Sequence, residues 1–350
     1  MNMLHSQYLK AGLIVVSLFA LWACADKSPV YAQMQGRIFA TTYSLQFRQP
    51  AEALDVDALQ AEVDARLKQL DYIFSTYKSD SELSQFNAIQ STAEGSFPEI
   101  ALPISPEFVE VFELSKRIYT LSNGAFDPSI GPLVNLWGFG PKLSIENFQQ
   151  QPSEADIENA LLTLNFDQQA VYPESITKTQ AIYLDFSAVA KGYAVDQLVK
   201  LLESKGIKHM MVEIGGELAT RGQSSRGGNW KIGVEAPENA LNKTFSVLSL
   251  SKASVATSGD YRNYFEYEGV RYSHTLDPRS GKPIHHKLAS VTVVADNVAE
   301  ADAWATALMV LGEQEGFLLA QKLGLNALFI MRKESGFAVA KTGEIDQYIQ

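Results

Sequence analysis

Residues 181–222 constrain the fold more strongly than any other part of the chain, because they predict two strands with a helix between them. Residues 181–186 form a short apolar run with β-branched and aromatic side chains, a composition typical of a strand. Ser187 follows as a candidate N-cap, since its hydroxyl can accept a hydrogen bond from a first-turn amide. Gly206 ends the predicted helix, and residues 209–214 predict the second strand. One apolar helix face is expected from side chains at helical spacing, namely Ala194, Leu198, Leu201 and Leu202.

Polar residues gather where this helix is expected to begin, which predicts an anion site. Asp185, Ser187 and Lys191 fall in or beside the first turn. Free amides and the helix dipole at such a position favour a negatively charged group such as a phosphate. Because most junctions between a strand and a helix bind no ligand, this pattern alone does not identify a function.

The other segments alternate between amphipathic helices and β-rich runs. Helices are expected at residues 53–70, 105–121 and 298–311, the last opened by Asn297 and ended by Gly312. Strands are expected at residues 37–47, 230–235, 245–250, 265–267, 270–275, 289–295, 325–331 and 336–340.

A stretch rich in glycine and proline at residues 124–141 interrupts this alternation. Its aromatic side chains distinguish it from a solvated linker. Long ordered loops of this kind are uncommon and often line binding sites. Residues 143–165 are more polar and predict a peripheral helical segment.

Length and net charge limit the size of the fold and the kind of partner. A chain of 350 residues can form one large domain or two smaller ones. The formal net charge of −11 argues against a nucleic-acid partner, which would need a basic surface. An anionic substrate remains compatible with this charge if a few local cations or a metal ion hold it.

The N-terminus resembles the signal of a bacterial lipoprotein. Residues 1–10 are short and polar, and residues 11–23 form an apolar run too short to span a bilayer comfortably. The letters L-W-A-C, which end at Cys24, resemble a lipobox, whose cysteine is acylated and becomes the mature N-terminus. The alternative is a plain secretory signal with a stray cysteine. Both place the domain on the periplasmic side, and lipidation would anchor it to a bacterial membrane without crossing it. The expected organisation is a signal peptide at 1–23, a linker at 24–36 and one domain at 37–350.

Asp302 and Thr306 form a candidate metal site on the predicted helix 298–311. Residues four apart project from one helix face, so their carboxylate and hydroxyl oxygens would lie together. Hard oxygen ligands suit Mg²⁺, especially when substrate phosphates supply further ligands. The alternative is an exposed aspartate beside a threonine bonded to its own helix.

Several other side chains are candidates for chemistry or binding. His274 ends a predicted strand and could act as a base or hold a phosphate, although a single histidine is more often structural. Arg262 is a candidate phosphate contact, and a surface arginine is the alternative. Tyr77 and Phe126 could stack on a planar ring, whereas core packing is the usual role of an aromatic side chain.

Six stretches of the chain, in this order, resemble the ApbE family of flavin transferases. Together they span most of the sequence after the predicted linker. They read S-T-Y-K-S-D-S-E-L-S-Q-F-N, G-A-F-D-P-S-I-G-P-L-V-N-L-W-G-F-G-P, L-D-F-S-A-V-A-K-G-Y-A-V-D, V-E-I-G-G-E, S-H-T-L-D-P-R-S-G-K-P-I and E-A-D-A-W-A-T-A-L.

This resemblance implies a fold and a reaction. The fold would be α+β, with mixed, largely antiparallel sheets, packed helices and a T-fold-like architecture that holds the site between subdomains. FAD would be cleaved at its pyrophosphate with Mg²⁺, FMN would pass to a serine or threonine hydroxyl of an acceptor protein, and AMP would leave. Subunits of respiratory quinone reductases are the acceptors that the family implies.

The resemblance also implies roles for individual residues. Asp302, Thr306 and the backbone oxygen of Ala188 would hold the metal, and His274 would be the catalytic base. The chain has Ala305 where some relatives carry a second carboxylate. The implied flavin contacts are Ala40, Tyr77, Ala125, Phe126, Asp127, Asp185, Lys191 and Leu276.

Two alternative functions remain open at the level of sequence. One is an exported FAD pyrophosphatase, in which water replaces the acceptor hydroxyl and the products are FMN and AMP. The other is a non-catalytic flavin-binding lipoprotein. A carrier needs no metal at the pyrophosphate, so the presence of both Asp302 and Thr306 argues against it.

Overall fold

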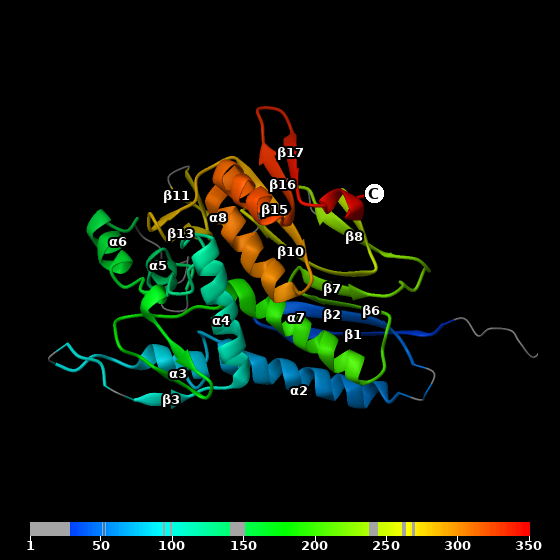
Figure 1. The fold of residues 1–350 in the computed structure, drawn as a ribbon, viewed down its shortest axis with the longest axis horizontal. Coiled ribbons are helices and arrows are strands. Elements are labelled where there is room, and N and C mark those ends of the chain that lie inside the picture. The colour runs from blue at the N-terminus through cyan, green and yellow to red at the C-terminus, as the bar shows by residue number, and fades with distance from the viewer. Residues whose placement is uncertain are drawn as a thin grey trace, which may run out of the picture.

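An eight-stranded sheet forms the centre of the molecule (Figure 1). The computed structural model describes residues 29–350 apart from 51, 53, 94, 99, 141–150, 238–243, 261–263 and 268–269. Neighbouring strands are all antiparallel, in the order β1-β2-β6-β7-β10-β15-β16-β17. The strands are β1 (Tyr31–Ile38), β2 (Thr41–Arg48), β6 (Met210–Ile214), β7 (Glu217–Arg221), β10 (Lys252–Gly259), β15 (Leu288–Ala295), β16 (Asn326–Arg332) and β17 (Phe337–Thr342).

Long helices cover one face of this sheet. The helices α7 and α8 pack against each other and on β6, β7, β10 and β15, while α4 packs on α2, α7 and α8. Their apolar faces and that side of the sheet form the larger hydrophobic core. These helices are α2 (Val56–Phe74), α4 (Pro106–Leu121), α7 (Ser187–Ser204) and α8 (Val298–Leu323).

A β-hairpin and the C-terminal segment cover the opposite face of the sheet. The hairpin consists of β8 (Trp230–Glu235) and β9 (Thr244–Leu250), and the segment contains the 3₁₀ helix η3 (Ile345–Tyr348). A second, smaller hydrophobic core lies between these elements and the sheet. Because both faces are covered, β15 is buried along nearly its whole length and reads as a continuous apolar run with only small polar residues.

Shorter elements extend the fold beyond the sheet and its helices. The α3 helix precedes the small sheet β3-β5-β4, and α5 and α6 lie beside the hairpins β11–β12 and β13–β14 (Figure 1). Their bounds are α3 (Glu82–Ala88), β3 (Ala101–Pro103), α5 (Gly131–Leu136), α6 (Glu154–Leu161), η2 (Phe166–Gln168), β4 (Val171–Tyr172), β5 (Ser175–Thr177), β11 (Tyr264–Tyr267), β12 (Val270–Ser273), β13 (Leu276–Asp277) and β14 (Lys282–Pro283).

The predicted α+β fold with antiparallel sheets is confirmed, and local capping chemistry explains where several helices begin. Ser105 accepts from the Phe108 amide at the start of α4, and Asn297 accepts from the Glu300 amide at the start of α8. The predicted helix end at Gly312 is confirmed, because this residue adopts the non-helical angles φ 76° and ψ −172°. A second helical segment follows it, so α8 consists of two helical segments joined at a kink. No helix in the described part of the chain is long and apolar enough to cross a membrane.

The prediction of a strand at residues 181–186 is wrong. This segment is extended and buries Ile182, Leu184 and Phe186 on one side, which explains its strand-like pattern. Its backbone joins no sheet, because the side chain of Asn87 both donates to the Leu184 carbonyl and accepts from the Leu184 amide, each at 2.8 Å. A side-chain amide therefore takes the place of a neighbouring strand.

Three further boundaries differ from the sequence predictions. Ser187 is the first residue of α7 and not its N-cap; Asp185 Oδ1 accepts from the Ser187 amide at 2.8 Å instead. Residues 31–36 of the predicted linker belong to β1, a polar strand at the edge of the sheet. The predicted loop 124–141 contains α5. The predicted lipidation residue Cys24 lies outside the described residues.

Candidate active site

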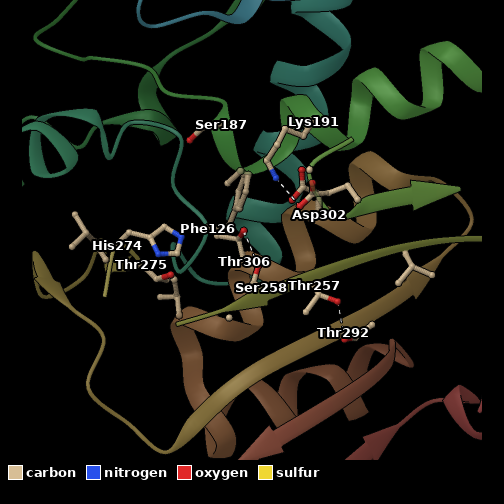
Figure 2. A pocket seen from close by; sticks show the side chains of 18 of the residues that line it. Phe126, Ser187, Lys191, Thr257, Ser258, His274, Thr275, Thr292, Asp302 and Thr306 are labelled. Carbon is tan, nitrogen blue, oxygen red and sulfur yellow. Dashed lines mark hydrogen bonds and ion pairs between the residues drawn. The ribbon is translucent and has the colours of Figure 1, made fainter. Parts of the chain in front are cut away.

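The central sheet has a notch beyond the start of β7, where β10 continues without this neighbour. Pairing between these strands stops at Leu218 and Val255, whereas β10 runs on beside β15 to Gly259. A cavity of about 480 Å³ lies at this sheet notch, which we define as the space beside residues 256–259. Its walls come from the loops 125–128 and 274–278, the starts of α7 and β7, the end of β10 and one face of α8 (Figure 2).

A lysine between two buried carboxylates occupies one end of the cavity. Lys191 on α7 lies 2.6 Å from Oε1 of Glu217 on β7, and Asp302 on α8 is 4% exposed (Figure 2). Burial alone would lower the pKa of Lys191, but the carboxylates of Asp302 and Glu217 together raise it. Burial raises the pKa of Asp302 well above its usual range; Lys191 opposes this shift and Glu217 adds to it. The three groups therefore depend on one another for their charge.

One carboxylate oxygen in this group has no partner. Glu217 Oε2 is buried and makes no hydrogen bond with any described residue. An unpaired carboxylate oxygen is costly in a protein interior, so its position on the cavity wall provides a ready acceptor for a ligand.

Close packing of α7 on α8 brings Lys191 and Asp302 together. The Gly192 amide donates to Asp302 Oδ2 at 3.1 Å, and a Cβ atom on Gly192 would lie 2.5 Å from the Val298 carbonyl oxygen. Asp196, one turn further along α7, accepts from two first-turn amides of α8 at 2.9 Å each. Only glycine permits this approach, and the half-buried Asp196 carboxylate fixes the start of α8 against α7.

The predicted metal ligands line the same cavity. Asp302 and Thr306 share one face of α8, and Ala188 lies in the first turn of α7. The Thr306 hydroxyl lies 3.4 Å from the hydroxyl of Ser258 at the end of β10. The described residues contain no group of three or more His, Cys, Asp or Glu side chains that could hold a metal. One carboxylate, one hydroxyl and one backbone oxygen fit Mg²⁺, which usually takes its remaining ligands from water and substrate phosphates.

Most of the predicted flavin contacts also line this cavity. The members of this group are Ala125, Phe126, Asp127, Asp185, Lys191 and Leu276. Burial raises the pKa of Asp127, although hydrogen bonds to its Oδ1 from the Ser129 amide and hydroxyl, at 2.7 and 2.6 Å, oppose the shift. Asp127 therefore already has hydrogen-bond donors within its own loop, and these bonds shape the loop beside the cavity.

Two predicted contacts lie outside the cavity lining, and a third is not among the described residues. Tyr77 is 72% exposed and outside the cavity lining, but partial burial and the nearby Asp185 carboxylate raise the pKa of Tyr77. Ala40, also outside the lining, occupies the β1–β2 turn with φ 58°. Arg262 lies outside the described residues.

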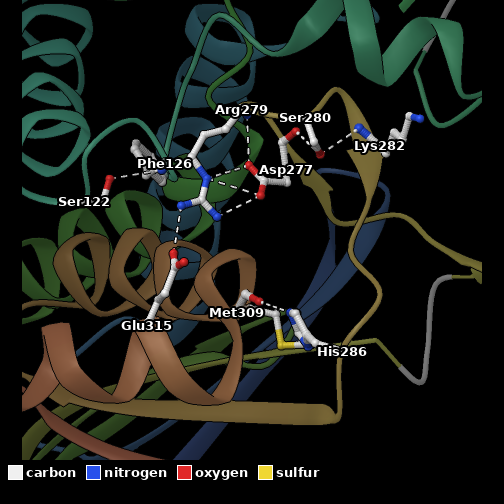
Figure 3. A network of polar contacts seen from close by, with 9 residues as sticks. All are labelled: Ser122, Phe126, Asp277, Arg279, Ser280, Lys282, His286, Met309 and Glu315. Atoms are coloured by element: carbon white, nitrogen blue, oxygen red, sulfur yellow. Dashed lines mark hydrogen bonds and ion pairs between the residues drawn. The ribbon is translucent and has the colours of Figure 1, made fainter. Parts of the chain in front are cut away.

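His274 lines the cavity from the loop between β12 and β13. Its ring lies edge-on to Phe139 with the centroids 6.4 Å apart, and Figure 2 shows it across the cavity from Lys191 and Asp302. The loop after it is tied to α8, because Arg279 donates to both carboxylate oxygens of Asp277 and to Glu315 Oε2 at 2.9 Å (Figure 3). A further bond joins Trp137 Nε1 to the Gly281 carbonyl at 2.8 Å.

Sequence reasoning missed three residues that shape this site. Glu217 lies within the motif V-E-I-G-G-E, but nothing in the local pattern indicated a buried ion pair with Lys191. Asp196 lies in the predicted helix that Gly206 ends, and Ser258 lies outside every strand that the sequence predicts. A carboxylate on an otherwise buried helix face was the one available signal for Asp196.

Taken together, the fold and the site define an enzyme-like class: an α+β protein whose cavity combines a partly buried lysine, hard oxygen ligands for a cation and a histidine. Such a cavity suits an anionic phosphate-containing substrate. The family model described as "ApbE family" matches residues 39–329. The chain belongs to the ApbE family.

Curated relatives and solved structures agree with this assignment. A protein from Vibrio cholerae named FAD:protein FMN transferase is 35% identical over 94% of this chain and 96% of its own length. A protein of the same name from Haemophilus influenzae is also 35% identical, over 94% of each chain. The crystal structure of Pseudomonas stutzeri flavinyl transferase ApbE, in its apo form, has a TM-score of 0.82 and 37% identity, covering 92% of this chain and 98% of that one.

Proposed function

We propose that this protein transfers FMN from FAD to a serine or threonine hydroxyl of an acceptor protein and releases AMP. The relatives named FAD:protein FMN transferase support this reaction. The structural observation that carries it is the meeting of Lys191, Asp302, Thr306 and His274 at one cavity. These residues come from three distant parts of the chain, so their convergence indicates a site for one substrate.

The reaction is a phosphoryl transfer, which depends mainly on positioning and on neutralising charge. The acceptor oxygen forms a new bond to the phosphorus of the FMN half, and the bond from that phosphorus to the bridging pyrophosphate oxygen breaks. AMP leaves with the bridging oxygen. His274 takes the proton of the acceptor hydroxyl, which makes the oxygen a better nucleophile. Lys191 contributes a fixed positive charge to the cavity.

Mg²⁺ is the cation that this donor set fits best. Asp302, Thr306 and the backbone oxygen of Ala188 would hold it. When bound, it would supply positive charge that offsets the charge developing on the pyrophosphate. The unpaired Glu217 Oε2 adds negative charge near this position and is compatible with a cation there.

Incubation of the protein with FAD and Mg²⁺, with and without acceptor, tests the proposal. Formation of AMP only when the acceptor is present, together with a covalently flavinylated acceptor, is the expected result. AMP without acceptor would instead identify an FAD pyrophosphatase. Intact FAD bound to the protein would identify a carrier and overturn the proposal.

The variant Asp302→Ala tests the metal assignment in the same assay. Loss of its carboxylate should abolish transfer at every Mg²⁺ concentration, because hydroxyl and carbonyl oxygens alone bind Mg²⁺ weakly. The matched variant Asp346→Ala removes an exposed carboxylate of η3 and should retain activity. Normal flavinylation by Asp302→Ala would refute the assignment.

We also infer that the protein is exported and anchored by a lipid on Cys24, and that its acceptors act outside the cytoplasm. The sequence before the described residues supports this inference. Subunits of respiratory quinone reductases are the acceptors we propose to test first. Cys24→Ala should abolish incorporation of labelled palmitate and release the protein from the membrane fraction. Unchanged labelling would refute the anchor without affecting the proposed reaction.

A further inference from the structure

Among the described residues, the end of β10 has no neighbouring strand on the side that faces the cavity. In an antiparallel strand, the N–H and C=O groups of alternate residues point to opposite neighbours. The Asp260 amide donates to the Ala289 carbonyl of the β15 segment, so Asp260 and Ser258 bond toward β15. Thr257 and Gly259 therefore direct their backbone groups the other way, past the end of β7.

No strand of the described chain occupies this edge. The first β7 residue paired with β10 is Leu218, opposite Val255. The chain enters β7 from β6 through the turn at Gly215 and Gly216, so β7 does not extend along the rest of β10. Burial changes at the same point, since Val255 and Ala256 are buried and the next four residues are partly exposed. Unpaired backbone groups beside a cavity need a partner from water or a ligand.

We propose that an extended segment of the acceptor protein adds to this edge as a strand, in line with β7. This inference rests on the proposed transfer to a protein acceptor and adds how that acceptor is bound. The backbone groups of Thr257 and Gly259 repeat every two residues, which is the repeat that a second strand matches. The added segment would extend the ladder that β7 already forms on the same side of β10.

The position of this edge suits the reaction. Thr257, Ser258 and Gly259 line the same cavity as His274, Thr306 and Asp302. A segment paired there would place its serine or threonine beside the cavity in which FMN transfer occurs. Ser258 and Gly259 are small, so they leave room for side chains of the incoming strand. Main-chain hydrogen bonds can also hold segments of many different sequences, and pockets for their side chains then provide the specificity.

Proline substitution on the enzyme tests this binding mode. Gly259→Pro removes an N–H that points away from β15, a position where a strand edge tolerates proline. It should raise the KM for the acceptor by about fivefold, as expected for one lost hydrogen bond, without weakening FAD binding. Gly259→Ala keeps the N–H, so the difference in KM between the two variants measures the lost hydrogen bond apart from any effect of the added side chain. A weaker FAD affinity with an unchanged acceptor KM would overturn the proposal by assigning the edge to the nucleotide.

A second measurement leaves the enzyme unchanged. Synthetic peptides of roughly ten residues, centred on the flavinylated residue of the acceptor, are tested as competitors of the full acceptor. N-methylation of single peptide amides should weaken competition at every second position and leave the positions between them unaffected. Equal effects at all positions, or no competition by the unmodified peptide, would overturn the proposal. Flavinylation of the full acceptor by the wild-type enzyme shows separately that the transfer reaction holds.

Discussion

The positive charge of Lys191 and the negative charges of Glu217 and Asp302 stabilise one another. Its side chain is 29% exposed, whereas that of Glu217 is only 6% exposed. Removing the lysine would leave two carboxylates in a buried position without a counter-charge, which is a costly arrangement. Stability and electrostatics of the site are therefore properties of the same three residues.

Lys191→Met should lower the free energy of unfolding by about 3 kcal/mol. This value is at the lower end of the range for breaking a buried ion pair, because Lys191 is partly exposed. Lys191 lowers the pKa of Asp302, so without the lysine the folded-state pKa of Asp302 would lie still further above its unfolded value. The folded protein then binds more protons than the unfolded chain, and stability falls as the pH rises through this range. Urea denaturation should show a larger loss at about pH 8 than at about pH 5.

A surface ion pair provides the control for this experiment. Lys205→Met breaks an exposed pair with Glu62 and should change stability by less than about 1 kcal/mol, with little dependence on pH. An equal loss in both lysine variants would show that Lys191 has no special electrostatic role.

His274→Ala should reduce the rate of transfer by about a hundredfold or more, because general base catalysis typically contributes that much. The affinity for FAD should stay unchanged if the histidine acts on the acceptor hydroxyl. His285→Ala, an exposed histidine near the same loop, is the matched control and should retain activity. Rapid-quench measurement of AMP distinguishes a slower chemical step from weaker binding. A wild-type rate in His274→Ala would exclude the histidine as the base.

At the scale of elements, the sequence predicted the segments whose signals are local. The amphipathic patterns of α2 and α4 and the hairpin strands β8 and β9 all appear where the sequence predicts them. The prediction for residues 181–186 was wrong because buried and exposed side chains alternate along this segment as they do in a strand. Its backbone instead bonds to the side chain of Asn87, a residue remote in sequence. The strand β1 was missed in part because its first residues are largely polar and lie at a sheet edge.

The crossing of α7 over α8 gives a direct test at this scale. Gly192→Ala should lower the free energy of unfolding by about 1–3 kcal/mol, because the new Cβ atom meets backbone that cannot easily move. The new Cβ atom should push α7 away from α8 and so separate Lys191 from Asp302. Transfer activity should therefore fall by a larger factor than the loss of folded protein explains. Chemical denaturation and activity per folded molecule measure the two effects.

Gly233→Ala is the control for this contact. Its Cβ atom would meet only Thr244 at 3.4 Å, an ordinary contact, so stability should change by less than about 0.5 kcal/mol. A Gly192→Ala variant as stable as Gly233→Ala would contradict the role assigned to the close helix crossing.

At the scale of the whole molecule, the candidate site is assembled from segments that are distant in sequence. The chain indicated Asp302 with Thr306, because helical spacing places both on one face. It could not indicate that Glu217 pairs with Lys191, or that β7 stops short and leaves the sheet notch, because these features depend on long-range packing. Most of the site residues that the resemblance to a family named line one cavity.

The central claim is that α7 and α8 bring their oxygen ligands to one cation beside the bound nucleotide. Crystals grown with FAD and Mn²⁺ test it most directly, because Mn²⁺ scatters X-rays anomalously and replaces Mg²⁺ at oxygen sites. We expect an anomalous peak roughly 2.0–2.3 Å from Asp302 Oδ, Thr306 Oγ1 and the Ala188 carbonyl oxygen, next to the pyrophosphate. A peak that omits Ala188, or one that lies away from α8, would contradict this account.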